Sequence, residues 1–181
     1  MIKMLKGPAA KTVGLAAILI GFQGIAQAET TKRDVQVGAK AAAFVQPELT
    51  GDIATAIVFD PSNAASKADA DTIAAALGDG MKIKHGTLRP KLVPLNDTAA
   101  LATARVVFLA HGVGDGMSSV ASAAATNAIL TISNDMSCVE TDRCVVGVQS
   151  KPKVSIVVSK AASAAANLQF GAAFLMMVKE R

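Results

Sequence analysis

The chain has 181 residues, of which 51% are hydrophobic and only 3% aromatic, and its formal net charge is +4. Tryptophan and tyrosine are absent, so the aromatic platforms on which proteins stack bases or sugars are scarce and the core must be largely aliphatic. Three of the 18 basic residues lie before residue 29 and all 14 acidic residues lie from residue 29 onward, which leaves +1 on the remainder. No run of lysine and arginine remains to neutralise a row of phosphates, so nucleic-acid binding is not expected.

The first residues have the layout of a secretory signal. Three lysines precede an apolar stretch at residues 15–22, and an AQA triplet ending at Ala28 matches the small-x-small pattern that signal peptidase cleaves. The apolar stretch is shorter than the roughly 20 residues that a membrane-spanning helix needs. We therefore expect residues 1–28 to be a signal peptide cleaved after Ala28, with an uncleaved N-terminal anchor as the alternative. Residues 29–181 then suit a single domain.

After a polar junction at residues 29–34, short β-branched runs alternate with alanine-rich segments. In chain order the predicted elements are a strand at 53–59, a helix that Ser62 or Asn63 caps and Gly78 ends, a strand at 88–95, a short helix at 97–103, a strand at 105–110, a helix at 117–127 and a strand at 128–132. Pro90 and Pro94 favour a sheet edge for their strand, whereas the apolar run at 105–110 is typical of the middle of a parallel sheet. This order predicts an α/β fold with a single open, mostly parallel, doubly wound sheet.

The C-terminal third has a different pattern. Residues 144–149 and 154–159, separated by the turn sequence SKPK, predict an antiparallel hairpin added to the same sheet. A helix is expected at 161–168, and an apolar segment of undecided type follows at 170–178. Its FLMM run, residues 174–177, is expected to pack in the core, with a pliable partner-binding patch as the alternative.

Cys138 and Cys144 are the only two cysteines. In an oxidising compartment two nearby thiols are expected to form a disulfide, which here would pin an irregular segment at 134–143. A metal site is the alternative, but the only histidines, His85 and His111, do not stand at a zinc-finger spacing.

The candidate ligand or partner site consists of residues that follow two predicted strands. His111 begins a glycine-rich turn in which Gly112 and Gly114 leave backbone N–H groups open to an anion, and Asn134 and Asp135 follow the next strand. If the two strands are neighbours, these residues form one polar cluster. The alternatives are a tight strand-to-helix turn and a simple helix cap at Asp135. Neither a catalytic partner for the histidine nor a dinucleotide fingerprint is recognisable, so we expect no enzyme activity and no cofactor.

Several segments carry a resemblance to a known family. They are the strand ending at Asp60, the strand at 88–95, ARVVFLA at 104–110, AILTISND at 128–135 and the closing stretch at 144–177. With these segments in this order, the chain resembles the YfiR family of small periplasmic proteins. It departs from the family pattern at 41–52, where an aromatic segment is usual, at Arg143-Cys144 in place of a Gly-Gly pair, and at Ser159 in place of an asparagine.

The resemblance to YfiR implies a non-enzymatic periplasmic regulator. Such a protein contacts the outward-facing domain of a membrane-bound diguanylate cyclase and holds the cyclase inactive, with disulfide-dependent stability and a homodimer as further implications. A second resemblance, carried by FDPSNAAS at 59–66, is to one lobe of a periplasmic substrate-binding protein and implies capture of a small solute.

Overall fold

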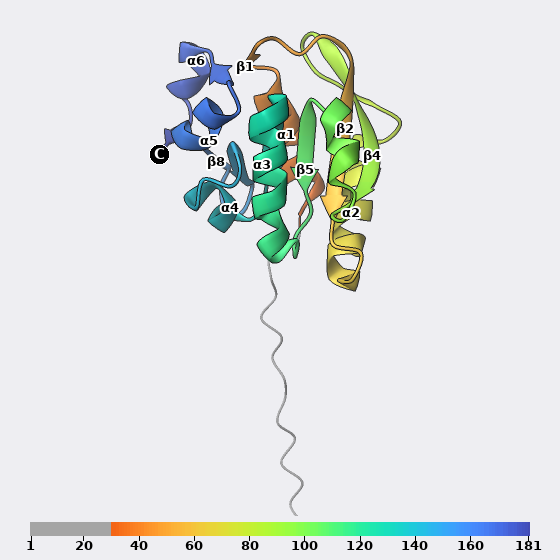
Figure 1. Ribbon diagram of the computed structural model, residues 1–181. Helices are drawn as coiled ribbons and strands as arrows, with labels where there is room; N and C mark the ends of the chain where they lie inside the picture. Colours follow the sequence, from red (N-terminus) through yellow and green to blue (C-terminus); the bar gives the residue numbers. More distant parts are fainter. Residues whose placement is uncertain (1–29) are drawn as a thin grey trace, which may run out of the picture.

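The computed structural model describes residues 30–181, so the predicted signal peptide and its cleavage site lie outside the described residues. In chain order the elements are α1 (Lys32–Ala42), β1 (Val45–Gln46), β2 (Gly51–Phe59), α2 (Ala64–Leu77), β3 (Met81–Lys82), β4 (Gly86–Pro94), the 3₁₀ helix η1 (Thr98–Thr103), β5 (Val106–Leu109), the 3₁₀ helix η2 (Gly114–Gly116), α3 (Met117–Asn127), β6 (Leu130–Ser133), α4 (Met136–Glu140), β7 (Val146–Gln149), β8 (Ser155–Val158), α5 (Lys160–Ala165), β9 (Gln169–Phe170), α6 (Ala172–Leu175) and β10 (Lys179–Glu180). Figure 1 shows their arrangement.

An open eight-stranded sheet forms the centre of the fold, with the order β10-β8-β7-β6-β5-β2-β4-β3. Five consecutive strands, from β7 to β4, run parallel, and β8 pairs antiparallel with β7 as the predicted hairpin. A separate two-stranded sheet pairs β1 with β9. The predicted α/β class with a mostly parallel sheet is therefore confirmed. The chain passes from β2 to β4 on one side and then to β5 on the other, so the topological switch point lies between β2 and β5.

Helices cover both faces of this sheet because its central strands are apolar on both faces. Along β2, Ile57 packs in the core beneath α1 and α2, while the next residue, Val58, packs on the opposite side beneath η1 and α3. Phe108 and Val107 of β5 divide between the same two layers. In Figure 1, α3 crosses the front of the sheet and α1 lies behind it.

Helix α1 corrects the expectation of a polar junction at 29–34. The helix begins at Lys32 because Thr31 and Asp34 form a capping box, in which each side chain accepts a hydrogen bond from the other residue's backbone N–H. Further along α1, a Cβ added to Gly38 would lie 2.8 Å from Ile132 Cγ2. Glycine there lets the helix backbone approach the sheet closely.

Two boundaries differ from prediction for identifiable reasons. Strand β6 begins at Leu130 rather than 128, because Ala128 has a left-handed φ of 53° as the C-cap of α3. The segment 134–143, expected to be irregular, contains α4, whose N-cap is Asp135. Strand β4 lies one position from the sheet edge, and β3 pairs with only two of its residues, consistent with the edge character predicted from its prolines.

The C-terminal apolar segment is not uniformly buried. Phe174 of α6 is 3% exposed and packs in the core, but Met176 and Met177 are 84% and 69% exposed. Core packing of these two methionines, the expected role, is therefore wrong. None of the helices within residues 30–181 has the length and hydropathy required to cross a bilayer.

Candidate functional site

The predicted site residues share one edge of the sheet. Strands β5 and β6 are parallel neighbours, paired from Val106 with Leu130 to Leu109 with Ser133. The segments that begin at His111 and Asn134 therefore leave the sheet side by side. In open α/β sheets this carboxyl edge, near the switch point, is where ligands usually bind.

Asp69 of α2 is the centre of this edge. It is 4% exposed, and its carboxylate accepts three hydrogen bonds of 2.7 Å each, from Thr30 N, Thr30 Oγ1 and His111 N. One buried carboxylate thus joins the N-terminal segment, α2 and the end of β5. The donor in the bond from His111 to Asp69 is the backbone N–H.

Asp34 of α1 performs a similar role at the end of β7. Its carboxylate accepts hydrogen bonds from Thr31 N at 2.8 Å, from Thr31 Oγ1 at 2.6 Å and from Ser150 N at 2.7 Å. Burial raises the pKa of Asp34, but the hydrogen bonds from Thr31 and Ser150 outweigh burial and hold the pKa below its ordinary value. The carboxylate is therefore stabilised in its charged form.

Hydrogen bonds also bridge the switch point itself. Asn63 caps α2 through Oδ1, and its Nδ2 donates to Gly112 O at 3.2 Å across the gap between β2 and β5. Gly112 has a φ of 79° and Gly114 a φ of 56°, both left-handed, so the glycines supply the backbone conformation of the turn. The tight-turn interpretation accounts for their positions.

The remaining two predicted residues divide between a cavity and a helix cap. Asn134 lines a cavity of about 10 Å³ together with Thr30 and Asp34, which is enough for about one water molecule. Asp135 accepts a hydrogen bond from Ser137 N at 2.9 Å and caps α4, as the alternative interpretation of its position held. The carboxyl edge is thus filled by side chains and backbone of the chain itself.

Sequence reasoning missed Thr30, Asp34 and Asp69. A signal for Asp34 was present, since a threonine three residues before an acidic residue is the capping-box pattern. Asp69 stands four residues before the buried Ile73 and so lies on the inward stripe of α2, but an aspartate in an alanine-rich helix gives no sign of burial by its residue type.

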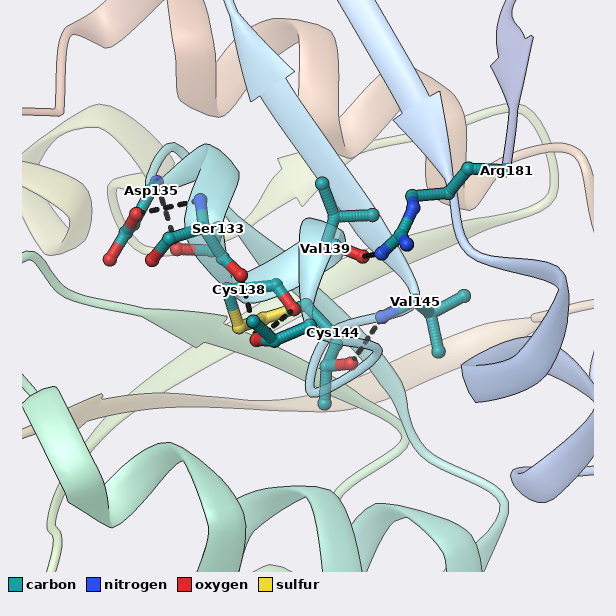
Figure 2. The surroundings of a disulfide bond; sticks show 10 residues. Ser133, Asp135, Cys138, Val139, Cys144, Val145 and Arg181 are labelled. Atoms are coloured by element: carbon teal, nitrogen blue, oxygen red, sulfur yellow. Dashed lines mark hydrogen bonds between the residues drawn. A yellow bond between two sulfur atoms is a disulfide. The ribbon is translucent and has the colours of Figure 1, made fainter.

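A second polar region surrounds the disulfide. Cys138 and Cys144 are joined, with Cα atoms 5.3 Å apart, and both are fully buried, which confirms the predicted bridge (Figure 2). Two backbone hydrogen bonds also span the loop, since Arg143 N and Cys144 N both donate to Cys138 O. Since the thiols bind each other, they do not form the alternative metal site. Residues 30–181 contain no cluster of three or more histidine, cysteine or acidic side chains suited to a metal ion.

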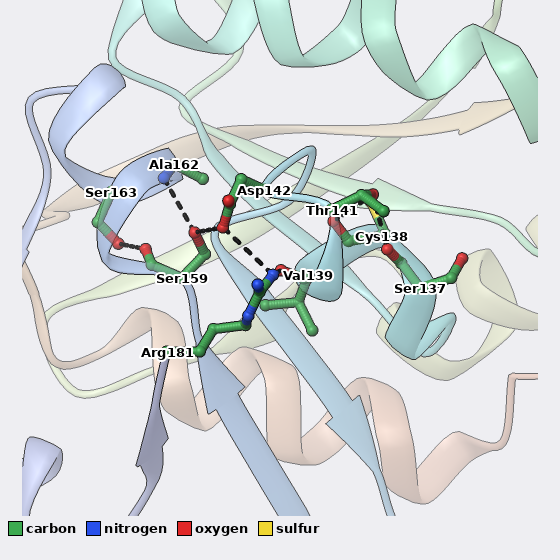
Figure 3. Close-up of polar contacts among 9 residues, drawn as sticks. All are labelled: Ser137, Cys138, Val139, Thr141, Asp142, Ser159, Ala162, Ser163 and Arg181. Carbon is green, nitrogen blue, oxygen red and sulfur yellow. Dashed lines mark hydrogen bonds and ion pairs between the residues drawn. The ribbon is translucent and has the colours of Figure 1, made fainter.

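Arg181 fastens this loop to the end of the chain (Figure 3). Its Nη1 donates to Val139 O at 2.7 Å and lies 3.4 Å from Asp142 Oδ1, which also accepts a hydrogen bond of 2.7 Å from Ser159 Oγ. Arg181 N donates to Val158 O, so the residue continues the pairing of β10 with β8. The arrangement is a structural clamp on α4 and the loop, with exposed charges.

Comparison with known proteins finds a similar fold but names no function. No family model matches the chain, and none of the curated proteins matches it. A conserved domain protein from Vibrio cholerae has a similar structure, with a TM-score of 0.59 and 12% identity, and the match covers 84% of this chain and 60% of that one. This chain therefore spans less than two thirds of that protein, and the likeness shows a shared fold alone.

Proposed function

We propose that the protein is an exported, non-enzymatic regulator of the YfiR kind, which binds the outward-facing domain of a membrane-bound signalling protein of the diguanylate cyclase type. One observation carries the proposal beyond the sequence resemblance. The carboxyl edge, where α/β sheets hold small ligands, is filled by the protein's own Thr30, Asp34 and Asp69. A protein built this way has its exposed surfaces left for binding.

Export is supported by two features of the chain. A buried disulfide is expected in an oxidising compartment and is rare in a reducing one. In addition, Thr30 is already engaged by Asp69, two residues beyond the proposed cleavage after Ala28. The proposed cleavage would therefore keep Thr30, with its bonds to Asp69, in the mature protein.

The alternative of small-solute capture lacks support at the place where it was expected. A solute at the switch point would have to displace the bonds from Asn63 to Gly112 and from His111 to Asp69. The two buried carboxylates are likewise engaged by backbone N–H groups and hydroxyls, which leaves them poorly placed for acid–base chemistry on a substrate.

Deletion of the gene in its native host tests the regulatory function. We expect higher intracellular cyclic di-GMP and stronger surface attachment, restored to normal by the wild-type gene. If both stay unchanged under conditions where the protein is made, the regulatory function is wrong. A thermal-shift screen checks the solute alternative, because a bound solute stabilises the protein by RT ln(1 + [L]/Kd) and the shift saturates with concentration.

Export is tested by the mass of the protein recovered from the host. We expect a chain that begins at Glu29 and is two hydrogens lighter than its reduced form. Full-length, reduced protein in the cytosolic fraction would contradict both the compartment and the processing.

A further inference from the structure

A groove lies between α1 and β3, at the edge of the sheet away from the disulfide. Its volume is about 620 Å³, and its apolar lining includes Phe44, Met81 and Ile83. Phe44, one of six phenylalanines in the chain, is 39% exposed, so a scarce large apolar side chain lies at the surface. We call this feature the α1–β3 groove.

Three lysines, Lys40, Lys82 and Lys84, also line the α1–β3 groove. All three are exposed, and none of the ion pairs among residues 30–181 includes them. The lining contains no acidic residue. The groove therefore presents three unneutralised positive charges around an apolar interior, although residues 29–181 together carry a net charge of only +1.

A ring contact joins the groove to the C-terminal region. The ring of Phe44 stacks on Phe174 of α6, with centroids 5.0 Å apart, and α6 is followed directly by the exposed Met176 and Met177. Phe44, Met176 and Met177 are three of the five exposed large hydrophobic side chains among residues 30–181. Methionine side chains adapt to irregular partners, which suits a surface for protein binding.

The groove also borders an unpaired backbone edge. Strand β3 is the outermost strand of the sheet, and among residues 30–181 no strand pairs with its far side. An extended segment from another protein can add to such an edge through main-chain hydrogen bonds while its side chains enter adjacent pockets.

We infer that the α1–β3 groove docks a segment of a partner protein in which apolar side chains are accompanied by aspartate or glutamate. The inference rests on the proposed function, in that the protein acts by binding another protein, and it names the surface and the chemistry of that contact. Carboxylates of the segment pair with Lys40, Lys82 and Lys84, while its apolar side chains cover Phe44 and Ile83.

Two other occupants fit the same surface less well. A lipid bilayer is a broad surface and does not enter a concave groove between a helix and a strand. A second copy of the chain, bound by two-fold symmetry with this groove on the axis, would bring two sets of three lysines together. The charges favour a partner of opposite sign.

The test uses a short amphipathic peptide with leucines on one face and glutamates on the other, and a matched peptide with lysines in place of the glutamates. Amide NMR spectra of the purified protein should shift at Phe44 and Ile83 on addition of the glutamate peptide and stay unchanged with the lysine peptide. The triple variant Lys40→Glu, Lys82→Glu, Lys84→Glu should bind the glutamate peptide roughly tenfold more weakly or worse. The control variant Lys151→Glu, Lys153→Glu, Lys179→Glu changes three exposed lysines outside the groove and should bind as wild type does.

Three outcomes overturn the inference. The first is equal binding of both peptides. The second is binding of phosphatidylcholine vesicles containing one-quarter phosphatidylglycerol, lost in the triple variant, with no peptide binding. The third is a wild-type dimer in sedimentation equilibrium that the triple variant abolishes.

Failure of the groove is distinguishable from failure of the proposed function. If gene deletion raises cyclic di-GMP and the folded triple variant returns it fully to the wild-type level, the regulatory function stands and the docking role of the groove is wrong. If deletion has no effect while the peptide binds as described, the groove stands and the regulatory function is wrong.

Discussion

Two regions of the molecule join distant parts of the chain by different physical means. At the carboxyl edge, the buried Asp34 and Asp69 receive donors from segments as far as 116 residues away. At the C-terminal end, a disulfide closes a loop of sequence separation 6, and Arg181 holds it through an ion pair whose side chains are 39% and 44% exposed. We therefore expect the buried carboxylates to contribute more to the stability of the domain than the covalent bridge does.

The largest effect is expected from Asp69→Ala. The change leaves Thr30 N, Thr30 Oγ1 and His111 N without their acceptor, which should lower the free energy of unfolding by about 3 kcal/mol or more. Urea denaturation of the purified protein measures the loss. Asp71→Ala is the control, because Asp71 is 53% exposed, pairs only with Lys67 and should change stability by no more than about 0.5 kcal/mol. Equal losses in the two variants would contradict the role given to Asp69.

Asp34→Asn should have the next largest effect and should also change the dependence of stability on pH. Because the pKa of Asp34 is lowered in the folded state, the unfolded state binds more protons as the pH falls. Its stabilisation is present in full above about pH 4, the ordinary aspartate pKa, and is lost as the pH falls through the lowered value. At neutral pH the variant should lose about 2 kcal/mol, measured by urea denaturation.

The control for this pH effect is Asp60→Asn. The pKa of Asp60 is also lowered, by hydrogen bonds from Ser62, but its side chain is in solvent. A lowered pKa contributes to the slope of stability against pH in both cases, so each variant should flatten the slope in part. The loss of stability at neutral pH should be much smaller in Asp60→Asn, because its hydrogen bonds with Ser62 are exposed to solvent. A slope that Asp34→Asn leaves intact would assign the acid sensitivity to another group.

Removal of the disulfide with Cys138→Ala and Cys144→Ala should lower stability by about 2 kcal/mol or less, because so short a loop loses little entropy on closure. The loss should be local. Hydrogen exchange should accelerate in residues 138–145 and stay near wild type in β2 and β5. Faster hydrogen exchange throughout the domain would show that the disulfide contributes more to stability than the buried carboxylates do.

Arg181→Ala should have the smallest effect, about 0.5 kcal/mol, because its ion pair with Asp142 is exposed to solvent. The residual effect reflects the bond to Val139 O, so it should persist when salt screens the ion pair. Thermal unfolding at low and high salt provides the measurement, with Lys179→Ala as the control. If Arg181→Ala lowered the free energy of unfolding as much as Asp69→Ala, the contacts of Arg181 would be a major contribution to stability.

Much of the fold was predictable because its signals are local. The apolar run at 105–110 and the two β-branched runs around SKPK specify a central strand and a hairpin by composition alone, and the structure has both. Helix α1 was missed because its 11 residues include three charged residues at the start and a glycine in the middle. Its capping box and the spacing of Val35, Ala39 and Ala42 were the available signals.

The candidate site was predictable in place but not in content. The edge shared by His111 and Asn134 follows from two neighbouring parallel strands, and the structure has that pairing. The residues that fill the edge come from α1 and α2, and their arrival there depends on how the helices pack on the sheet. That packing is a property of the whole fold, which no local pattern around Asp34 or Asp69 contains.

The bond between Asp34 and Ser150 has a consequence for how the domain is completed under the proposed export. A polypeptide that threads through a translocation channel emerges with its N-terminal end first, so α1 reaches the far side long before the end of β7. The carboxylate of Asp34 can bind the backbone N–H of Ser150 only after the chain has emerged 116 residues further. The Asp34 bond cannot form until residue 150 has crossed, and the sheet cannot gain its edge strand β10 until residues 179 and 180 have crossed.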